Sequence, residues 1–131
     1  MQRIEDATIN AKHRKFHKLC IPTLRGFELV SVSEILYLEA DNSYTTFYME
    51  GNIKHVATKN IGFYEMELEA DPFLRIHQSY MVNINKVKSY LKADNGYVIL
   101  TTGKNIRVSR SKKEELLEFF KLRRNPNKGS K

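Results

Sequence analysis

The chain has 131 residues, and its 41% of hydrophobic residues is enough to bury the core of one ordinary domain without disulfides or metals. No apolar run approaches the roughly 18 residues that a membrane span needs, and the N-terminus lacks a signal-peptide apolar stretch, so we expect a soluble, cytoplasmic protein with no membrane partner. The net charge of +7 is compatible with a nucleic-acid partner, and the single cysteine, Cys20, excludes an internal disulfide.

The first third of the chain predicts a thin amphipathic helix followed by short strands. Residues 3–18 contain good helix formers but few apolar positions, so we interpret 1–18 as a linker segment. Bursts of β-branched and aromatic residues follow, and Pro22 is expected on a sheet edge because proline cannot donate to a ladder. Turns are predicted at Asp41-Asn42-Ser43 and Glu50-Gly51-Asn52. The predicted strands are 19–24, 27–32, 35–40, 44–49 and 52–57.

A short acidic helix is predicted next, with Thr58 as its cap and its end near Leu68. Ile61, Tyr64 and Leu68 would form its buried side. Asp71-Pro72 ends this helix, since the residue before proline avoids the helical region.

Strands resume in the second half, and a terminal helix closes the domain. Asp94-Asn95-Gly96 predicts a type I′ turn, whose two central positions need a positive φ. Ser111 and Glu114 form a capping-box pattern that opens a helix over 112–123, and 124–131 is expected to be a disordered tail. The predicted strands are 73–84, 87–92, 96–101 and 106–109. We therefore expect one mainly β domain over 19–123.

Charge is segregated along the middle of the chain. Residues 20–71 hold three basic and nine acidic side chains, while residues 72–113 hold nine basic side chains and one acid, Asp94. A polyanion would be attracted to the second segment. Two ordinary solvated faces that differ in charge are the alternative interpretation.

Patterns for catalysis or metal binding are weak. The six glycines occur singly, so neither a phosphate-binding loop nor a dinucleotide fingerprint is present. His13, His17 and Cys20 have helical spacing, but a closed metal site usually needs a fourth ligand, and we prefer a solvated stripe. His55 is interpreted as an ordinary strand residue.

Carboxylates in the strands give no catalytic pair either. We expect Glu39 and Asp41, on either side of Ala40, to point to opposite faces of their strand, which argues against an acid and base pair. The sequence thus predicts neither an enzyme nor a cofactor.

Polar side chains gather instead where strands give way to turns. Gln and Arg can make bidentate contacts with adenine and guanine in the major groove, while Ser, Lys and Tyr suit phosphates. Turn and cap chemistry is the alternative interpretation of each residue. The three groups are Asn42-Ser43-Tyr44, His77-Gln78-Ser79 and the run from Ser109 to Lys113.

Three blocks in order resemble the LytTR domain, over about Leu19 to Phe120. They are ILYLEADNSYTTFYMEG, FLRIHQSYMVNINKV and GYVILTTGKNIRVSRSKKEEL. The resemblance implies an elongated stack of small, mostly antiparallel sheets with one inserted short helix and a C-terminal helix. It also implies that loop side chains enter successive major grooves of double-stranded DNA.

By motif position, the resemblance assigns roles to individual residues. Tyr44, Gln78 and Arg110 would contact bases. Arg75 and His77 would brace the central block. Phosphate contacts would come from Asn42, Ser43, Ser79, Lys112 and Lys113.

The resemblance further implies the output domain of a LytR/AlgR-like response regulator in a bacterial two-component system. Such a protein would regulate transcription, carry an upstream receiver domain, and dimerise on promoter repeats.

Two alternatives remain at this stage. One is a non-catalytic β-rich protein-interaction module that uses the acidic helix over 58–70. The other is single-strand binding by aromatic side chains, which would have to be exposed on one sheet face. Those side chains are Tyr37, Tyr44, Phe47, Tyr48 and Tyr80.

Overall fold

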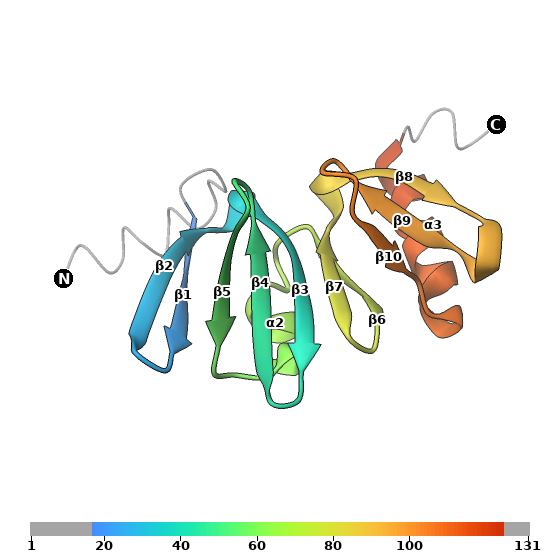
Figure 1. Ribbon diagram of the computed structural model, residues 1–131. Helices are drawn as coiled ribbons and strands as arrows, with labels where there is room; N and C mark the ends of the chain where they lie inside the picture. The colour runs from blue at the N-terminus through green and yellow to red at the C-terminus, as the bar shows by residue number, and fades with distance from the viewer. Residues whose placement is uncertain (1–16, 125–131) are drawn as a thin grey trace.

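The computed structural model describes residues 17–124, which form three antiparallel sheets and two α-helices (Figure 1). The strands are β1 (Lys18–Thr23), β2 (Gly26–Ser31), β3 (Ile35–Asp41), β4 (Tyr44–Met49), β5 (Ile53–Ala57), β6 (Phe73–His77), β7 (Tyr80–Asn83), β8 (Val87–Leu91), β9 (Tyr97–Leu100) and β10 (Asn105–Arg107). The α-helices are α2 (Ile61–Glu67) and α3 (Lys113–Arg124). The 3₁₀ turns are η2 (Val32–Glu34), η3 (Ile84–Lys86), η4 (Ala93–Asn95) and η5 (Arg110–Lys112).

The predicted mainly β architecture is confirmed. The β1–β2 hairpin, a five-stranded sheet in the order β5-β4-β3-β7-β6 and a three-stranded sheet in the order β10-β9-β8 follow one another as an elongated stack (Figure 1). Pro22 lies in β1, which pairs with β2 at the end of the stack, as expected for an edge position. The helix predicted over 3–18 lies outside the described residues except at its last two, His17 and Lys18, where Lys18 already begins β1.

Two buried clusters hold the stack together. The first packs α2 against the β1–β2 hairpin and the five-stranded sheet, and it includes Leu38, Phe47 and Tyr64. The second joins the five-stranded sheet to the three-stranded sheet and α3, and it includes Ile76 and Leu116. Because β3 and β7 contribute side chains to both clusters, the two larger sheets are packed as one body.

Local turn chemistry agrees with the sequence. Asp94 and Asn95 have φ of 48° and 74°, and the Gly96 N–H donates to Ala93 O at 2.9 Å, which confirms the predicted type I′ turn. Asn42 adopts a φ of 61° in the β3–β4 turn, a conformation that asparagine tolerates better than most residues.

Three element boundaries differ from the prediction. Helix α2 is capped by Asn60, whose side chain accepts from the Phe63 N–H at 3.0 Å, whereas the hydroxyl of Thr58 donates to Pro22 O. The run 73–84, predicted as one strand, is a hairpin that turns at residues 78–79. Within the described chain Ser111 Oγ contacts Ser109 Oγ at 3.4 Å and forms no capping box with Glu114, because a 3₁₀ turn precedes α3.

Among the described residues, no helix is both long enough and apolar enough to span a bilayer.

The hydroxyl of Tyr64 is buried in the first cluster and, among the described residues, has no hydrogen-bond partner. An unsatisfied buried hydroxyl costs free energy, so Tyr64→Phe is expected to raise the free energy of unfolding by about 1 kcal/mol at neutral pH. Chemical denaturation of the two proteins would measure this difference. A loss of stability in the variant would show that the hydroxyl has a partner.

The buried hydroxyl of Tyr64 also leads us to expect that the folded protein loses stability in alkali. Burial raises the pKa of Tyr64 to about 12, with smaller contributions from Cys20 and Glu67, because the phenolate loses its hydration. The folded chain thus holds this proton more tightly than the unfolded chain, whose tyrosines ionise near pH 10. The contribution to stability is present below about pH 10 and is lost as the pH rises toward 12. Tyr64→Phe should reduce this loss.

Candidate nucleic-acid interface

The three predicted polar groups lie along one edge of the molecule. The β3–β4 turn, the β6–β7 turn and η5 with the start of α3 all face the lower edge in Figure 1. Two backbone hydrogen bonds connect them through the adjoining strands: Ala40 N in β3 donates to Ser79 O, and Ser109 N donates to Ile76 O in β6, each at 2.8 Å. We call this surface the turn edge and define it as residues 42–44, 78–79 and 109–113.

The first segment of the turn edge is a two-residue connection. Asn42 and Ser43 are exposed between the paired residues Asp41 and Tyr44. Tyr44 is 38% exposed. Tyr44 therefore stands at the edge with an acid across from it, where a hydrogen bond or a stacking contact is available to its ring and hydroxyl.

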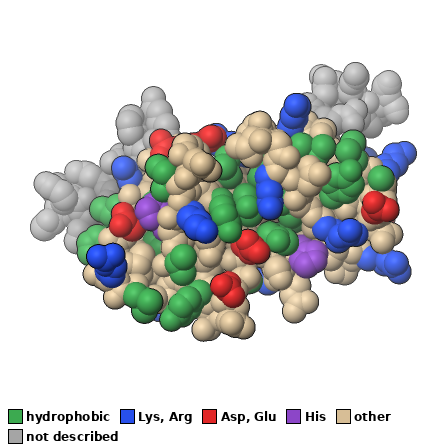
Figure 2. Space-filling model, viewed as in Figure 1, with side chains coloured by type: hydrophobic (Ala, Val, Ile, Leu, Met, Phe, Trp, Pro, Cys, Tyr) green, Lys and Arg blue, Asp and Glu red, His purple; other side chains and the backbone are tan. Residues whose placement is uncertain are grey.

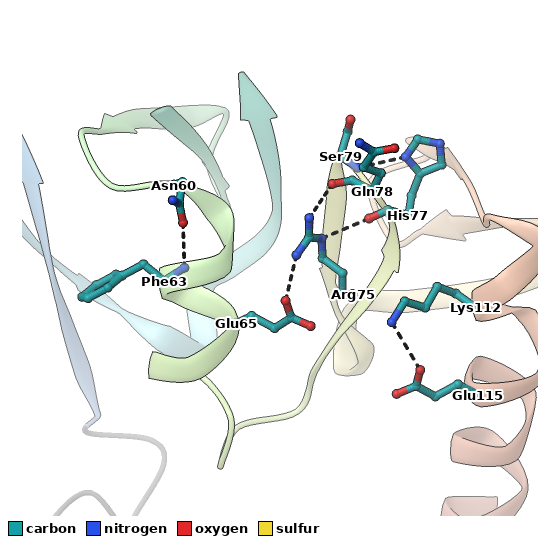
Figure 3. Close-up of polar contacts among 9 residues, drawn as sticks. All are labelled: Asn60, Phe63, Glu65, Arg75, His77, Gln78, Ser79, Lys112 and Glu115. Atoms are coloured by element: carbon teal, nitrogen blue, oxygen red, sulfur yellow. Dashed lines mark hydrogen bonds and ion pairs between the residues drawn. The ribbon is translucent and has the colours of Figure 1, made fainter. Parts of the chain in front are cut away.

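Arg75, in β6, holds the backbone of the second segment. Its Nε donates to His77 O at 3.1 Å, and its Nη2 donates to Gln78 O at 2.6 Å (Figure 3). Ser79 N donates to His77 Nδ1 at 3.0 Å. The expectation that Arg75 and His77 brace the central block is confirmed. The Gln78 side chain is left exposed.

The third segment follows β10 directly. Arg110 is exposed in η5, and among the described residues it has no acidic side chain within ion-pair distance. The Lys112 ammonium lies 3.6 Å from Glu115 Oε1 on α3. Gln78, Ser109, Ser111 and Lys112 line one surface hollow, so the second and third segments adjoin each other.

The basic segment 72–113 does not form a single face. Lys86 pairs with Glu50 at 2.7 Å, and Lys104 lines a hollow with Gly51 and Asn52. Both lie near the β4–β5 turn, which is at the opposite end of β4 from the turn edge. The sum of charges over residues 72–113 therefore overstates the positive charge that is available at the turn edge.

On the face shown in Figure 2, basic side chains lie over the three-stranded sheet and α3, and also over the β1–β2 hairpin and the five-stranded sheet. Acidic side chains lie mainly over the five-stranded sheet. The segregation of charge along the sequence is therefore only partly kept on this face, because basic side chains lie at both ends of it.

The other candidate sites have ordinary roles. His13 lies outside the described residues, and the Nε2 atom of His17 contacts Asp71 Oδ2 at 3.3 Å. Within the described chain, no three His, Cys, Asp or Glu side chains are grouped as metal ligands. His55 pairs with Phe47 in the sheet, as an ordinary strand residue.

The expectation that Glu39 and Asp41 point to opposite faces is wrong. Alternate residues of a strand share a face, and these two lie opposite Thr46 and Tyr44 in the register. Glu39 accepts from the hydroxyls of Tyr48 and Tyr80 at 3.1 and 3.3 Å, so its carboxylate is part of a structural network.

Few of the aromatic side chains proposed for single-strand binding are exposed enough to stack on bases. Phe47 is fully buried, Tyr37 is 6% exposed, and the rings of Tyr37 and Tyr48 stack on each other with centroids 4.4 Å apart. Burial and the neighbouring phenols and Glu39 raise the pKa of Tyr37 well above its ordinary value. Of the five aromatic residues proposed for single-strand binding, Tyr44 alone is exposed.

One contributor to the site was not predicted. Glu65 of α2 lines the same hollow as Gln78 and forms an ion pair with Arg75 at 2.7 Å. Its separation of ten residues from Arg75 gives no local pattern from which the contact could be inferred.

Comparison with known proteins identifies relatives of this arrangement. The profile of the LytTr DNA-binding domain matches residues 25–121. The sensory transduction protein LytT of Bacillus anthracis is 25% identical over 123 residues, covering 92% of this chain and 48% of that protein. An uncharacterised response regulatory protein of Yersinia pestis is 32% identical over 109 residues, covering 78% of this chain and 45% of that protein.

A solved structure has the same fold. It is the LytTr DNA-binding domain of a methyl-accepting/DNA response regulator from Bacillus cereus, with a TM-score of 0.68 and 24% identity. The match covers 77% of this chain and 94% of that structure. The chain spans about half the length of the curated relatives it matches.

Proposed function

The chain belongs to the LytTr DNA-binding domain family, and from this we propose that it recognises specific duplex DNA sequences through the side chains of its turn edge. The observation that carries the proposal is the alignment on one edge of three polar segments, each with exposed residues, connected by backbone hydrogen bonds. Short turns on a packed β scaffold can enter a major groove about 12 Å wide while the sheets stay outside.

The chemistry of the turn edge suggests a division of roles. Arg110 and Gln78 suit the bidentate recognition of guanine and adenine, and Tyr44 would contact a third base. Contacts to phosphate would fix the register without carrying sequence information. The residues proposed for phosphate are Asn42, Ser43, Ser79, Lys112 and Lys113.

Helix α3 is poorly suited to lie in the groove itself. Glu114 and Glu115 occupy its first turn, and Leu116 is fully buried against the sheets. The acidic first turn would face phosphates unfavourably. This supports recognition by turns.

We further propose that the chain is the output domain of a cytoplasmic transcriptional regulator. Response regulators among its relatives, of which it spans about half, support a receiver domain in the same protein. Dimerisation onto promoter repeats would then place two turn edges on one face of the duplex.

The proposal is tested by titrating the chain against labelled duplexes with fluorescence anisotropy. A duplex enriched from a randomised library is compared with its scrambled version and with a single strand of the same sequence. We expect the enriched duplex to bind most tightly. Equal affinity for the enriched and scrambled duplexes would contradict sequence recognition, and equal affinity for the single strand would favour stacking.

The phosphate contacts predict a specific change in salt dependence. The double variant Lys112→Ala with Lys113→Ala is expected to reduce the slope of log affinity against log salt by about 2, because each lysine would neutralise one phosphate. The preference for the enriched duplex should change little. The matched control is Lys88→Ala with Lys92→Ala, which removes two exposed lysines on and next to β8, away from the turn edge. Equal slopes in both double variants would refute these contacts.

A further inference from the structure

An acidic side chain beside a DNA-binding surface is unfavourable for affinity, and Glu65 occupies such a place. Its side chain is 45% exposed and lines the hollow shared by Gln78, Ser109 and Lys112. A carboxylate there repels the phosphates that the surface would approach. Its presence therefore calls for a compensating role.

The contacts of Arg75 indicate that role. The guanidinium donates in three directions, to His77 O, to Gln78 O and to Glu65 Oε1 (Figure 3). The first two acceptors are the backbone carbonyls where β6 enters the turn. The third is the carboxylate, which approaches from α2 on the other side. Glu65 thus fixes the plane of a guanidinium that in turn holds the backbone at Gln78.

Without Glu65, the Nη1 end of Arg75 would be free beside the DNA. Arginine binds phosphate strongly and bidentately, and such a contact carries no sequence information. Rotation of the guanidinium toward a phosphate would also release the two turn carbonyls. Affinity for any duplex would rise, while the position of Gln78 would become less defined.

We infer that Glu65 is a positioning residue for sequence recognition: it keeps Arg75 engaged with the Gln78 turn and away from the DNA backbone. The inference rests on the proposed function. It assigns a role in DNA selectivity to Glu65 of α2 but not to Glu67 of the same helix. Glu67 is exposed and has no ion-pair partner among the described residues.

The test compares E65Q with E67Q, which makes the same change of charge on the same helix. The probes are the enriched and scrambled duplexes. We expect E65Q to lower the preference for the enriched duplex about tenfold and to steepen the salt slope by about 1, as one more cation reaches a phosphate. E67Q should leave both quantities near the values of the unmodified chain.

A second variant tests the arginine side of the contact. R75K keeps the positive charge but cannot donate to two carbonyls and a carboxylate in one plane. Its loss of preference should resemble that of E65Q, and the E65Q/R75K double variant should lose no more than either single variant, since both changes break one unit. Binding is measured well below the thermal midpoint of every variant, so that unfolding does not contribute.

The outcomes separate the inference from the proposed function. If the unmodified chain binds enriched and scrambled duplexes equally, the proposed function fails. If it discriminates and E65Q discriminates as well as E67Q does, the function stands and the role of Glu65 is refuted. Additive losses in the E65Q/R75K variant would likewise refute a shared unit.

Discussion

Replacing Arg110 with alanine is expected to weaken binding of the enriched duplex by about 1–3 kcal/mol, or roughly 5-fold to 150-fold. Arg110 is the exposed guanidinium of the turn edge with no acidic partner among the described residues, so nothing in the protein competes with a base for its donors. Its position is fixed from behind, because Ser109 N donates to Ile76 O. Little backbone freedom should therefore be lost when the side chain binds.

The loss should be specific to one base pair. Arg110→Lys keeps the charge without the planar fork and is expected to retain affinity for scrambled DNA while losing discrimination. The matched control is Arg107→Ala, which removes an exposed arginine from β10 whose Nη1 donates to Asp94 O in the distant β8–β9 turn. Anisotropy titrations measure the affinities, and a repeated library selection identifies the relaxed position. Equal losses for Arg107→Ala and Arg110→Ala would show that charge alone explains the effect.

The strands and most turns could be predicted because they depend on local chemistry. The Asp94-Asn95 turn needs two positive φ values, and the sequence supplies residues that tolerate them. The face of α2 could be predicted from the spacing of Ile61, Tyr64 and Leu68, all of which are buried. In these places the local sequence was enough to predict the structure.

The features that were missed depend on distant residues. The turn at Gln78-Ser79 contains no glycine, proline or asparagine, and Arg75 stabilises it from the adjoining strand. The partner of Arg75, Glu65, comes from a different element. The sum of charges along the sequence did not predict the charge of the turn edge for the same reason. Lys86 pairs with Glu50 only in the folded chain.

The three LytTR-like blocks located the turns of the site, but the sequence could not show which side chains hold these turns in place. The structure places Gln78 at one hollow with Ser109, Ser111 and Lys112 and leaves Tyr44 on the neighbouring turn. The contacts of individual side chains with bases remain predictions of the proposed function.

The largest effect on stability is expected from Leu116→Ala, at about 2–5 kcal/mol of the free energy of unfolding. Leu116 is fully buried in the cluster that joins α3 to the two larger sheets, together with Ile76 and Val108. Shortening it leaves a cavity between the helix and the strands that carry the second and third segments of the turn edge. Urea denaturation measures the loss.

Leu117 provides the matched control, because it undergoes the same chemical change one residue further along α3 but is only partly buried. Leu117→Ala should therefore cost clearly less than Leu116→Ala. Since η5 leads directly into α3, a loosened helix should also let Arg110 move, and the folded L116A protein should discriminate less between enriched and scrambled duplexes. Full discrimination by a destabilised L116A would show that Ser109 N and Ile76 O are sufficient to hold Arg110 without the packed helix.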